Sequence, residues 1–167
     1  MHMGSEQALE QSHLLRNPLV RFGWYDSYVF KVLILDNDPD MVSGTRLALE
    51  KRGYSVITAL SALEGQGMVE AERPDLILLE IMIPAGTEGF HFVWRLRKHS
   101  DPVLRNTPVV VVSAIHRTTE LRLYPELADR DYAPGEFLPV EAFLDKPVDL
   151  PLLAHTVERV LTSFRRA

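Results

Sequence analysis

The stretch DLILLEIMIP, residues 75–84, is almost entirely aliphatic but carries one carboxylate, Glu80, at its centre. A short apolar run of this kind is typical of a strand that is buried on both faces of a sheet. Charged side chains are seldom fully buried without a partner. The stretch therefore predicts a buried strand, and its acid is a working carboxylate, a structural acid paired with a cation, or the substitute for a shorter side chain.

Similar patterns predict four more strands and the helices between them. The strands are KVLILD (31–36), YSVIT (54–58), TPVVVVSA (107–114) and AFLDKP (142–147). The helices begin at Pro39, at the capping box SALE (61–64), after Gly89 and after Asp149. One face of the helix after Gly89 is predicted to hold Phe90, Val93, Trp94 and Arg97. The last helix is predicted to be amphipathic, with an apolar face at Leu153, Val157, Val160, Leu161 and Phe164. This alternation predicts an α/β fold with a parallel sheet that is covered on both faces.

Composition excludes several classes of protein. The 167 residues suffice for one domain with a full core. The net charge of -5 gives no electrostatic footprint for nucleic acid, and the absence of cysteine excludes disulfides and thiol chemistry. The longest apolar run, VVVVSAI (109–115), is too short to span a membrane. With no signal sequence at the start, we expect a cytoplasmic location.

Two segments fall outside the alternating pattern. The first five residues, MHMGS, are typical of a vector remnant, and five aromatic residues follow at Phe22, Trp24, Tyr25, Tyr28 and Phe30. We expect residues 1–30 to be an amino-terminal arm that packs on its own domain, on a second copy or on a partner, ahead of a domain at 31–167. Residues 115–140 carry three prolines and a glycine, which predicts at most a short helix near 118–124 and then an irregular loop.

Polar residues stand where the predicted strands end. In an open parallel sheet, ligands bind beyond the carboxyl ends of the strands. A polar residue at one strand end is weak evidence by itself. Two acidic groups, a hydroxyl group and a lysine at the same edge of the sheet together predict a binding site. The residues at this edge are Asp36, Asn37, Asp38, Glu80, Ser113 and Lys146.

These residues resemble the receiver domain of two-component response regulators. KVLILDNDPD, PDLILLEIMIP, VVVVSA and FLDKP stand in the order and spacing of that family, over about residues 31–165. The resemblance implies a flavodoxin-like (CheY-like) fold with five parallel strands in the order 2-1-3-4-5. Residues 115–140 would then replace much of the fourth helix of the family and remodel the surface that partners read.

The resemblance also implies roles for single residues. Glu80 stands at the position of the phosphorylated aspartate, and the acidic pocket corresponds to Asp36, Asn37 and Asp38. Asp36, Asn37 and Glu80 occupy the places that bind Mg²⁺. Ser113, Phe143 and Lys146 match the hydroxyl that senses phosphate, the aromatic residue that swings inward on activation, and the lysine that pairs with phosphate.

Two of these positions depart from the family pattern. Glutamate is one methylene longer than aspartate, which moves its carboxylate by roughly 1.5 Å, and a misplacement of about 1 Å can cost on the order of 10²-fold in rate. Asn37 offers Mg²⁺ an oxygen without a charge. We therefore expect Mg²⁺ binding to be weakened or lost, and phosphorylation at Glu80 to be disfavoured.

Several functional hypotheses follow. Glu80 imitates the phosphorylated state, or it merely pairs with Lys146 and holds the strand ends together. An ordinary phosphoacceptor receiver whose aspartate was replaced by engineering is an alternative, and a small metal-assisted hydrolase using Asp36, Glu80 and Lys146 is a rival from another class. We favour a stand-alone receiver, without enzymatic activity, that acts by contact with a histidine kinase, a downstream protein or a second copy.

Overall fold

The computed structural model describes residues 28–83, 88–114 and 138–165, and its centre is a five-stranded sheet. The strands lie in the order β2-β1-β3-β4-β5, and all neighbouring pairs are parallel. This order confirms the predicted topology. The strands are β1 (Lys31–Leu35), β2 (Ser55–Ala59), β3 (Leu76–Leu79), β4 (Val109–Ser113) and β5 (Ala142–Asp145).

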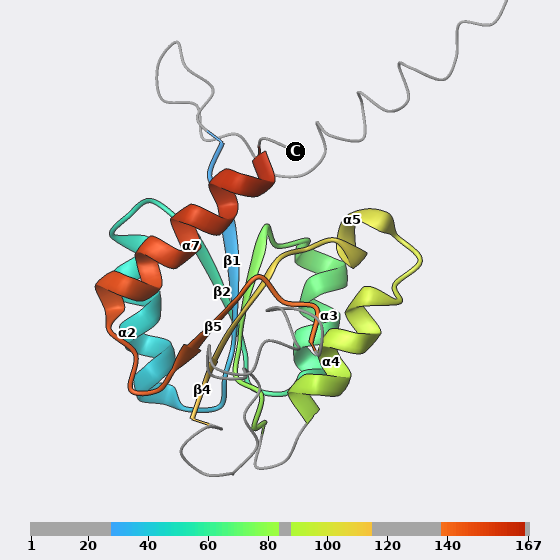
Figure 1. Cartoon of the computed structure of the whole chain (residues 1–167), viewed down its shortest axis with the longest axis horizontal. Helices are drawn as coiled ribbons and strands as arrows, with labels where there is room; N and C mark the ends of the chain where they lie inside the picture. Colours follow the sequence, from blue (N-terminus) through green and yellow to red (C-terminus); the bar gives the residue numbers. More distant parts are fainter. Residues whose placement is uncertain (1–27, 84–87, 115–137, 166–167) are drawn as a thin grey trace, which may run out of the picture.

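Helices cover both faces of the sheet, as Figure 1 shows. On one face lie α2 (Pro39–Glu50) and α7 (Leu150–Arg165), and on the other lie α3 (Ala62–Glu72) and α4 (Glu88–Arg97). A short helix, α5 (Pro102–Arg105), follows α4 and was not predicted. It begins because the carboxylate of Asp101 accepts a hydrogen bond from the backbone N–H of Val103 (2.8 Å) ahead of a first-turn proline.

Side-chain caps fix where the longer helices begin. Ser61 accepts a hydrogen bond from the N–H of Glu64 (3.1 Å), and the Glu64 carboxylate accepts one from the N–H of Leu60 (2.9 Å). The carboxylate of Asp149 accepts a hydrogen bond from the N–H of Leu152 (3.1 Å) at the start of α7. The predicted cap at Asp149 is therefore present. The predicted capping box is present with one difference, since Glu64 bonds the N–H of Leu60, one residue before the N-cap Ser61.

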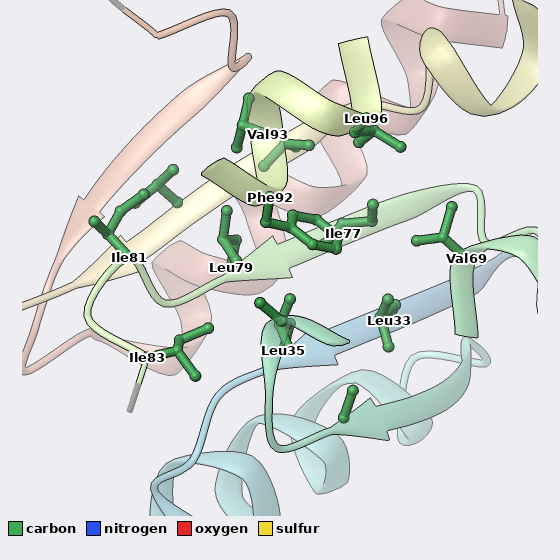
Figure 2. Close-up of a cluster of buried hydrophobic side chains, with 14 of the residues drawn as sticks. Leu33, Leu35, Val69, Ile77, Leu79, Ile81, Ile83, Phe92, Val93 and Leu96 are labelled. Atoms are coloured by element: carbon green, nitrogen blue, oxygen red, sulfur yellow. The ribbon is translucent and has the colours of Figure 1, made fainter. Parts of the chain in front are cut away.

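Two apolar cores enclose the sheet. Alternate residues of each strand point to opposite faces, so a strand covered on both faces is apolar throughout. Leu78 of β3 joins the core under α2 and α7, whereas Leu79 joins the core under α3 and α4. Figure 2 shows the second core, where side chains of β1 and β3 meet Phe92, Val93 and Leu96 of α4.

The buried face of α4 differs from the predicted one. Gly89, Phe92, Val93 and Leu96 are buried, whereas Trp94 is 44% exposed. The helix is rotated because its first turn lies directly against the end of β3. A Cβ atom added at Gly89 would lie 2.5 Å from the Cα of Ile81, so only glycine permits this close approach.

Two predicted segments lie outside the described residues. These are most of the amino-terminal arm (1–27) and most of the irregular segment that was expected to replace the fourth helix (115–137). The chain is described again from Leu138, which is buried in the core under α3 and α4. Among the described helices, none combines the length and hydropathy needed to cross a bilayer.

Candidate functional site

Four side chains meet at the carboxyl edge of the sheet. Asp36 follows β1, Glu80 follows β3, Ser113 ends β4, and Lys146 follows β5. Because all these strands are parallel, their carboxyl ends lie at one edge, the lower end of the view in Figure 1. We call Asp36, Glu80, Ser113 and Lys146 the strand-end cluster.

Lys146 joins the two carboxylates of the cluster. Its Nζ atom lies 2.6 Å from Oδ2 of Asp36 and 3.0 Å from Oε2 of Glu80. Both acids are buried, with exposed fractions of 3% for Asp36 and 6% for Glu80. A buried carboxylate needs such a partner, and Lys146 provides it for both acids.

The other carboxylate oxygen of Glu80 is also engaged. The hydroxyl of Ser113, which is fully buried, donates a hydrogen bond to Oε1, and the backbone N–H of Met82 donates another at 2.9 Å. Both oxygens of the glutamate are thus held by the cluster and by the loop after β3. The sequence did not predict that Met82 would donate to Glu80. Every residue except proline carries a backbone N–H, so the residue type does not indicate which N–H will act as a donor.

The lysine of the cluster stays charged. Burial alone would lower the pKa of Lys146, but the hydrogen bonds and the charges of Asp36 and Glu80 outweigh burial and raise this pKa above its ordinary value of 10.5. A group whose pKa is raised by folding stabilises the fold below the pKa of the unfolded chain. This contribution is lost as the pH rises through the folded pKa.

We therefore expect alkaline destabilisation that depends on Lys146. The free energy of unfolding should fall above about pH 10.5 with a slope of at most about 1.4 kcal/mol per pH unit from this group. Tyr54, whose pKa is also raised, mainly by burial, titrates in the same range. The comparison of Tyr54→Phe with Tyr54→Phe/Lys146→Met by urea unfolding isolates the lysine. If the free energy of unfolding fell equally steeply with pH in the two proteins, Lys146 would not contribute to the alkaline destabilisation.

The other two acidic-pocket candidates lie outside the strand-end cluster. Asp38 caps α2, where its Oδ1 accepts from the N–H groups of Asp40 (3.0 Å) and Met41 (3.2 Å). Its own N–H donates to Oδ1 of Asp36 at 2.9 Å. Asn37 and Asp38 are both exposed. The backbone N–H of Asp38 thus contacts the cluster at Asp36, whereas its carboxylate caps the first turn of α2.

The strand-end cluster offers Mg²⁺ only two carboxylates, Asp36 and Glu80, and both are already paired with Lys146. This ion prefers six oxygen ligands in near-octahedral geometry, whereas here an ammonium group already lies between the two buried carboxylates. Asp38, the nearest further acid in sequence, is committed to the cap of α2. Within 28–83, 88–114 and 138–165, no group of three or more histidine, aspartate or glutamate side chains is arranged to hold a metal.

Phe143 lies on β5, three residues before the lysine. It is partly buried and packs against the core under α3 and α4. Its partner in β4 is Val111, two residues before Ser113. The predicted switch residue thus lies beside the strand that carries the hydroxyl of the cluster.

An arginine holds the opposite ends of β4 and β5. The Arg97 guanidinium donates to the carbonyl oxygens of Pro139 (3.0 Å) and Thr107 (2.7 Å). Glu141, 3.6 Å from the same guanidinium, accepts a hydrogen bond from the N–H of Val109 (2.5 Å). These contacts hold β5, the edge strand that Lys146 follows, in place beside β4. The sequence placed Arg97 on a helix face but did not reveal its partners.

Comparisons with known proteins identify similar sequences. A family model described as "Response regulator receiver domain" matches residues 32–126. Protein PilH of Pseudomonas aeruginosa is 30% identical over 131 residues, which are 78% of this chain and 97% of PilH. Transcriptional regulatory protein CseB of Streptomyces coelicolor is 30% identical over 136 residues, which are 81% of this chain but only 51% of CseB.

Solved structures give the same fold. A response regulator receiver domain protein (CheY-like) from Methanospirillum hungatei JF-1 superposes with a TM-score of 0.65 at 23% identity, covering 83% of this chain and 98% of that one. Chemotaxis response regulator CheY4 of Vibrio cholerae gives a TM-score of 0.63 at 25% identity, covering 80% and 99%. The predicted flavodoxin-like architecture is confirmed.

Proposed function

Because this chain belongs to the response regulator receiver domain family of two-component signalling, we propose that it signals without phosphorylation. In this proposal Glu80 supplies permanently the negative charge that a phosphorylated aspartate supplies transiently. The observation that carries it is that one carboxylate engages both Ser113 and Lys146, the two residues that match the phosphate-sensing positions of the family.

Three features support the independence from phosphate. Both oxygens of Glu80 are already hydrogen-bonded or ion-paired, so a phosphoryl group would have to displace existing partners. The carboxylate is longer than the aspartate of the family pattern. Asn37 adds no charge for a metal ion, and phosphoryl transfer depends on positioning and on charge neutralisation.

The imitation is partial in charge. A phosphoryl group carries about −1.5 to −2 charges at neutral pH, whereas a glutamate carries one. A substitution shifts a two-state equilibrium only by its differential interaction with the two states. We therefore propose that Glu80 biases Ser113 and Phe143 toward the active arrangement without fixing it completely.

The output of the domain is protein contact. We assign residues 31–167 to the receiver domain and residues 1–30 to an arm that precedes it, and we place the protein in the cytoplasm. Its partners in this proposal are a histidine kinase or a downstream signalling protein. The two relatives differ in length beyond the matched region. The chain spans nearly all of PilH but only about half of CseB.

Phosphodonor labelling tests this proposal. The unmodified chain, Glu80→Asp and Glu80→Asp/Asn37→Asp are incubated with acetyl phosphate and Mg²⁺, and their intact masses are measured. We expect no phosphoryl adduct on the unmodified chain, and an adduct on the double variant because aspartate and the missing acid are both restored. Labelling of Glu80→Asp alone would favour a phosphoacceptor receiver whose aspartate was replaced. An adduct on Glu80 itself would refute the proposal.

A further inference from the structure

A hollow of about 360 Å³ lies at the amino end of the sheet, opposite the strand-end cluster. It is bounded by the residues that precede β1, β3 and β4, by α5 and by the last turn of α7. Figure 1 shows the start of β1, α5 and the end of α7 together at the upper end of the view. A volume of this size falls in the range of pockets that hold compact apolar groups.

The lining of the hollow is largely apolar. Its apolar side chains are Phe30, Pro74, Pro102, Val103, Pro108, Leu161 and Phe164. Two of them are notably exposed for their type, Val103 at 38% and Phe164 at 44%. Exposed apolar side chains that gather around one hollow mark an interaction surface rather than the scatter of a normal surface.

The described chain begins at the rim of this hollow. The hydroxyl of Tyr28 donates a hydrogen bond to the carboxylate of Asp75 (2.5 Å), and its ring meets that of Phe30 edge to face with centroids 5.0 Å apart. The Arg165 guanidinium lies over the same Phe30 ring, 5.8 Å from its centre. Phe30, Asp75 and Arg165 all line the hollow. The arm is therefore tethered at the edge of the surface that it would cover.

The residues just before Tyr28 have the composition to fill an apolar hollow. The sequence there reads FGWYDS (22–27). At most about 3.3–3.6 Å per residue separates positions along an extended chain. A chain that starts at Tyr28 can therefore reach at most about 10 Å by position 25 and about 20 Å by position 22. Because a tethered segment acts at a high effective concentration, the arm of the same chain has an advantage over a partner in solution.

We propose that the aromatic segment Phe22–Tyr25 of this chain is the occupant of the hollow. Aromatic rings bury large apolar areas with little loss of rotamer freedom, and the Arg165 guanidinium can contact a second ring as it contacts Phe30. The arm is then a part of the domain, at the end of the molecule farthest from the strand-end cluster.

Trp24 provides a direct reporter. The chain holds two tryptophans, Trp24 and Trp94. Trp94 is 44% exposed on α4, away from the hollow, so Trp94→Phe leaves Trp24 as the sole indole. In the full-length variant we expect Trp24 emission that is blue-shifted, and acrylamide quenching that is severalfold weaker, than in the urea-unfolded chain. Trp24 that is quenched equally in the folded and unfolded chains would refute the proposal.

Matched surface variants locate the binding site of the segment. In the Trp94→Phe chain, Val103→Lys and Phe164→Lys should each restore strong quenching of Trp24. Leu47→Lys, at a leucine on α2 that is 55% exposed and does not line the hollow, should not. Circular dichroism confirms that each variant is folded. Continued shielding in both hollow variants would refute the proposal, and so would shielding that disappears on dilution, because the arm would then cover a second copy.

Discussion

Replacing Lys146 with methionine should lower the free energy of unfolding by about 3–5 kcal/mol at neutral pH, because it leaves two carboxylates buried without a cation. Asp36 and Glu80 are each less than a tenth exposed, and Lys146 is the cation that contacts both. Methionine keeps much of the aliphatic stem, so lost packing contributes little to the change. Urea unfolding at constant ionic strength measures the loss.

Two comparisons separate this effect from a general loss of charge. Lys98→Met removes an exposed ammonium after α4 and should change stability by less than about 0.5 kcal/mol. Adding Glu80→Gln and Asp36→Asn to Lys146→Met removes the buried charges and should recover part of the loss. If Lys146→Met were as stable as Lys98→Met, the buried ion pairs would contribute nothing measurable to the free energy of unfolding.

Replacing Gly89 with alanine should cost about 2–3 kcal/mol, although alanine is the better helix former by roughly 1 kcal/mol. The added Cβ would lie 2.5 Å from Cα and 2.7 Å from the carbonyl oxygen of Ile81, and 2.9 Å from that of Glu80. Backbone atoms cannot rotate away as a side chain can. The end of β3 and α4 must therefore separate, which displaces Glu80 from Ser113 and Lys146.

Gly67 supplies the control for this substitution. It lies in α3, and a Cβ added there would have no neighbour within 4 Å. Gly67→Ala should therefore stabilise the protein by up to about 1 kcal/mol. Thermal unfolding of both variants measures the difference. If Gly89→Ala changed the thermal stability as little as Gly67→Ala does, α4 would not lie as close to the end of β3 as described.

The sequence predicted the sheet and the strand-end cluster for a simple reason. Parallel strands that alternate with helices have their carboxyl ends at one edge, so Asp36, Glu80, Ser113 and Lys146 had to arrive together once the strands were recognised. Caps such as Asp149 were also predictable, because their signal lies within a few residues of sequence.

Features that depend on contacts distant in sequence were not predictable in the same way. The rotation of α4 depends on how closely Gly89 approaches Ile81, and residue types alone do not give that distance. Asp38 carries the same charge as Asp36, but the N–H groups at the start of α2 take its carboxylate. The partners of Arg97 are mostly backbone carbonyls, which every residue offers.

The central claim is that the charge of Glu80 biases the switch residues, and amide NMR spectra of the unmodified chain and Glu80→Gln test it most directly. Glutamine keeps the shape of the side chain but removes the charge that pairs with Lys146. The account predicts chemical-shift changes at Met82 and Ser113 that extend to Phe143 on β5. Changes confined to the immediate partners of Glu80, with Phe143 unaffected, would contradict it and leave Glu80 a structural acid.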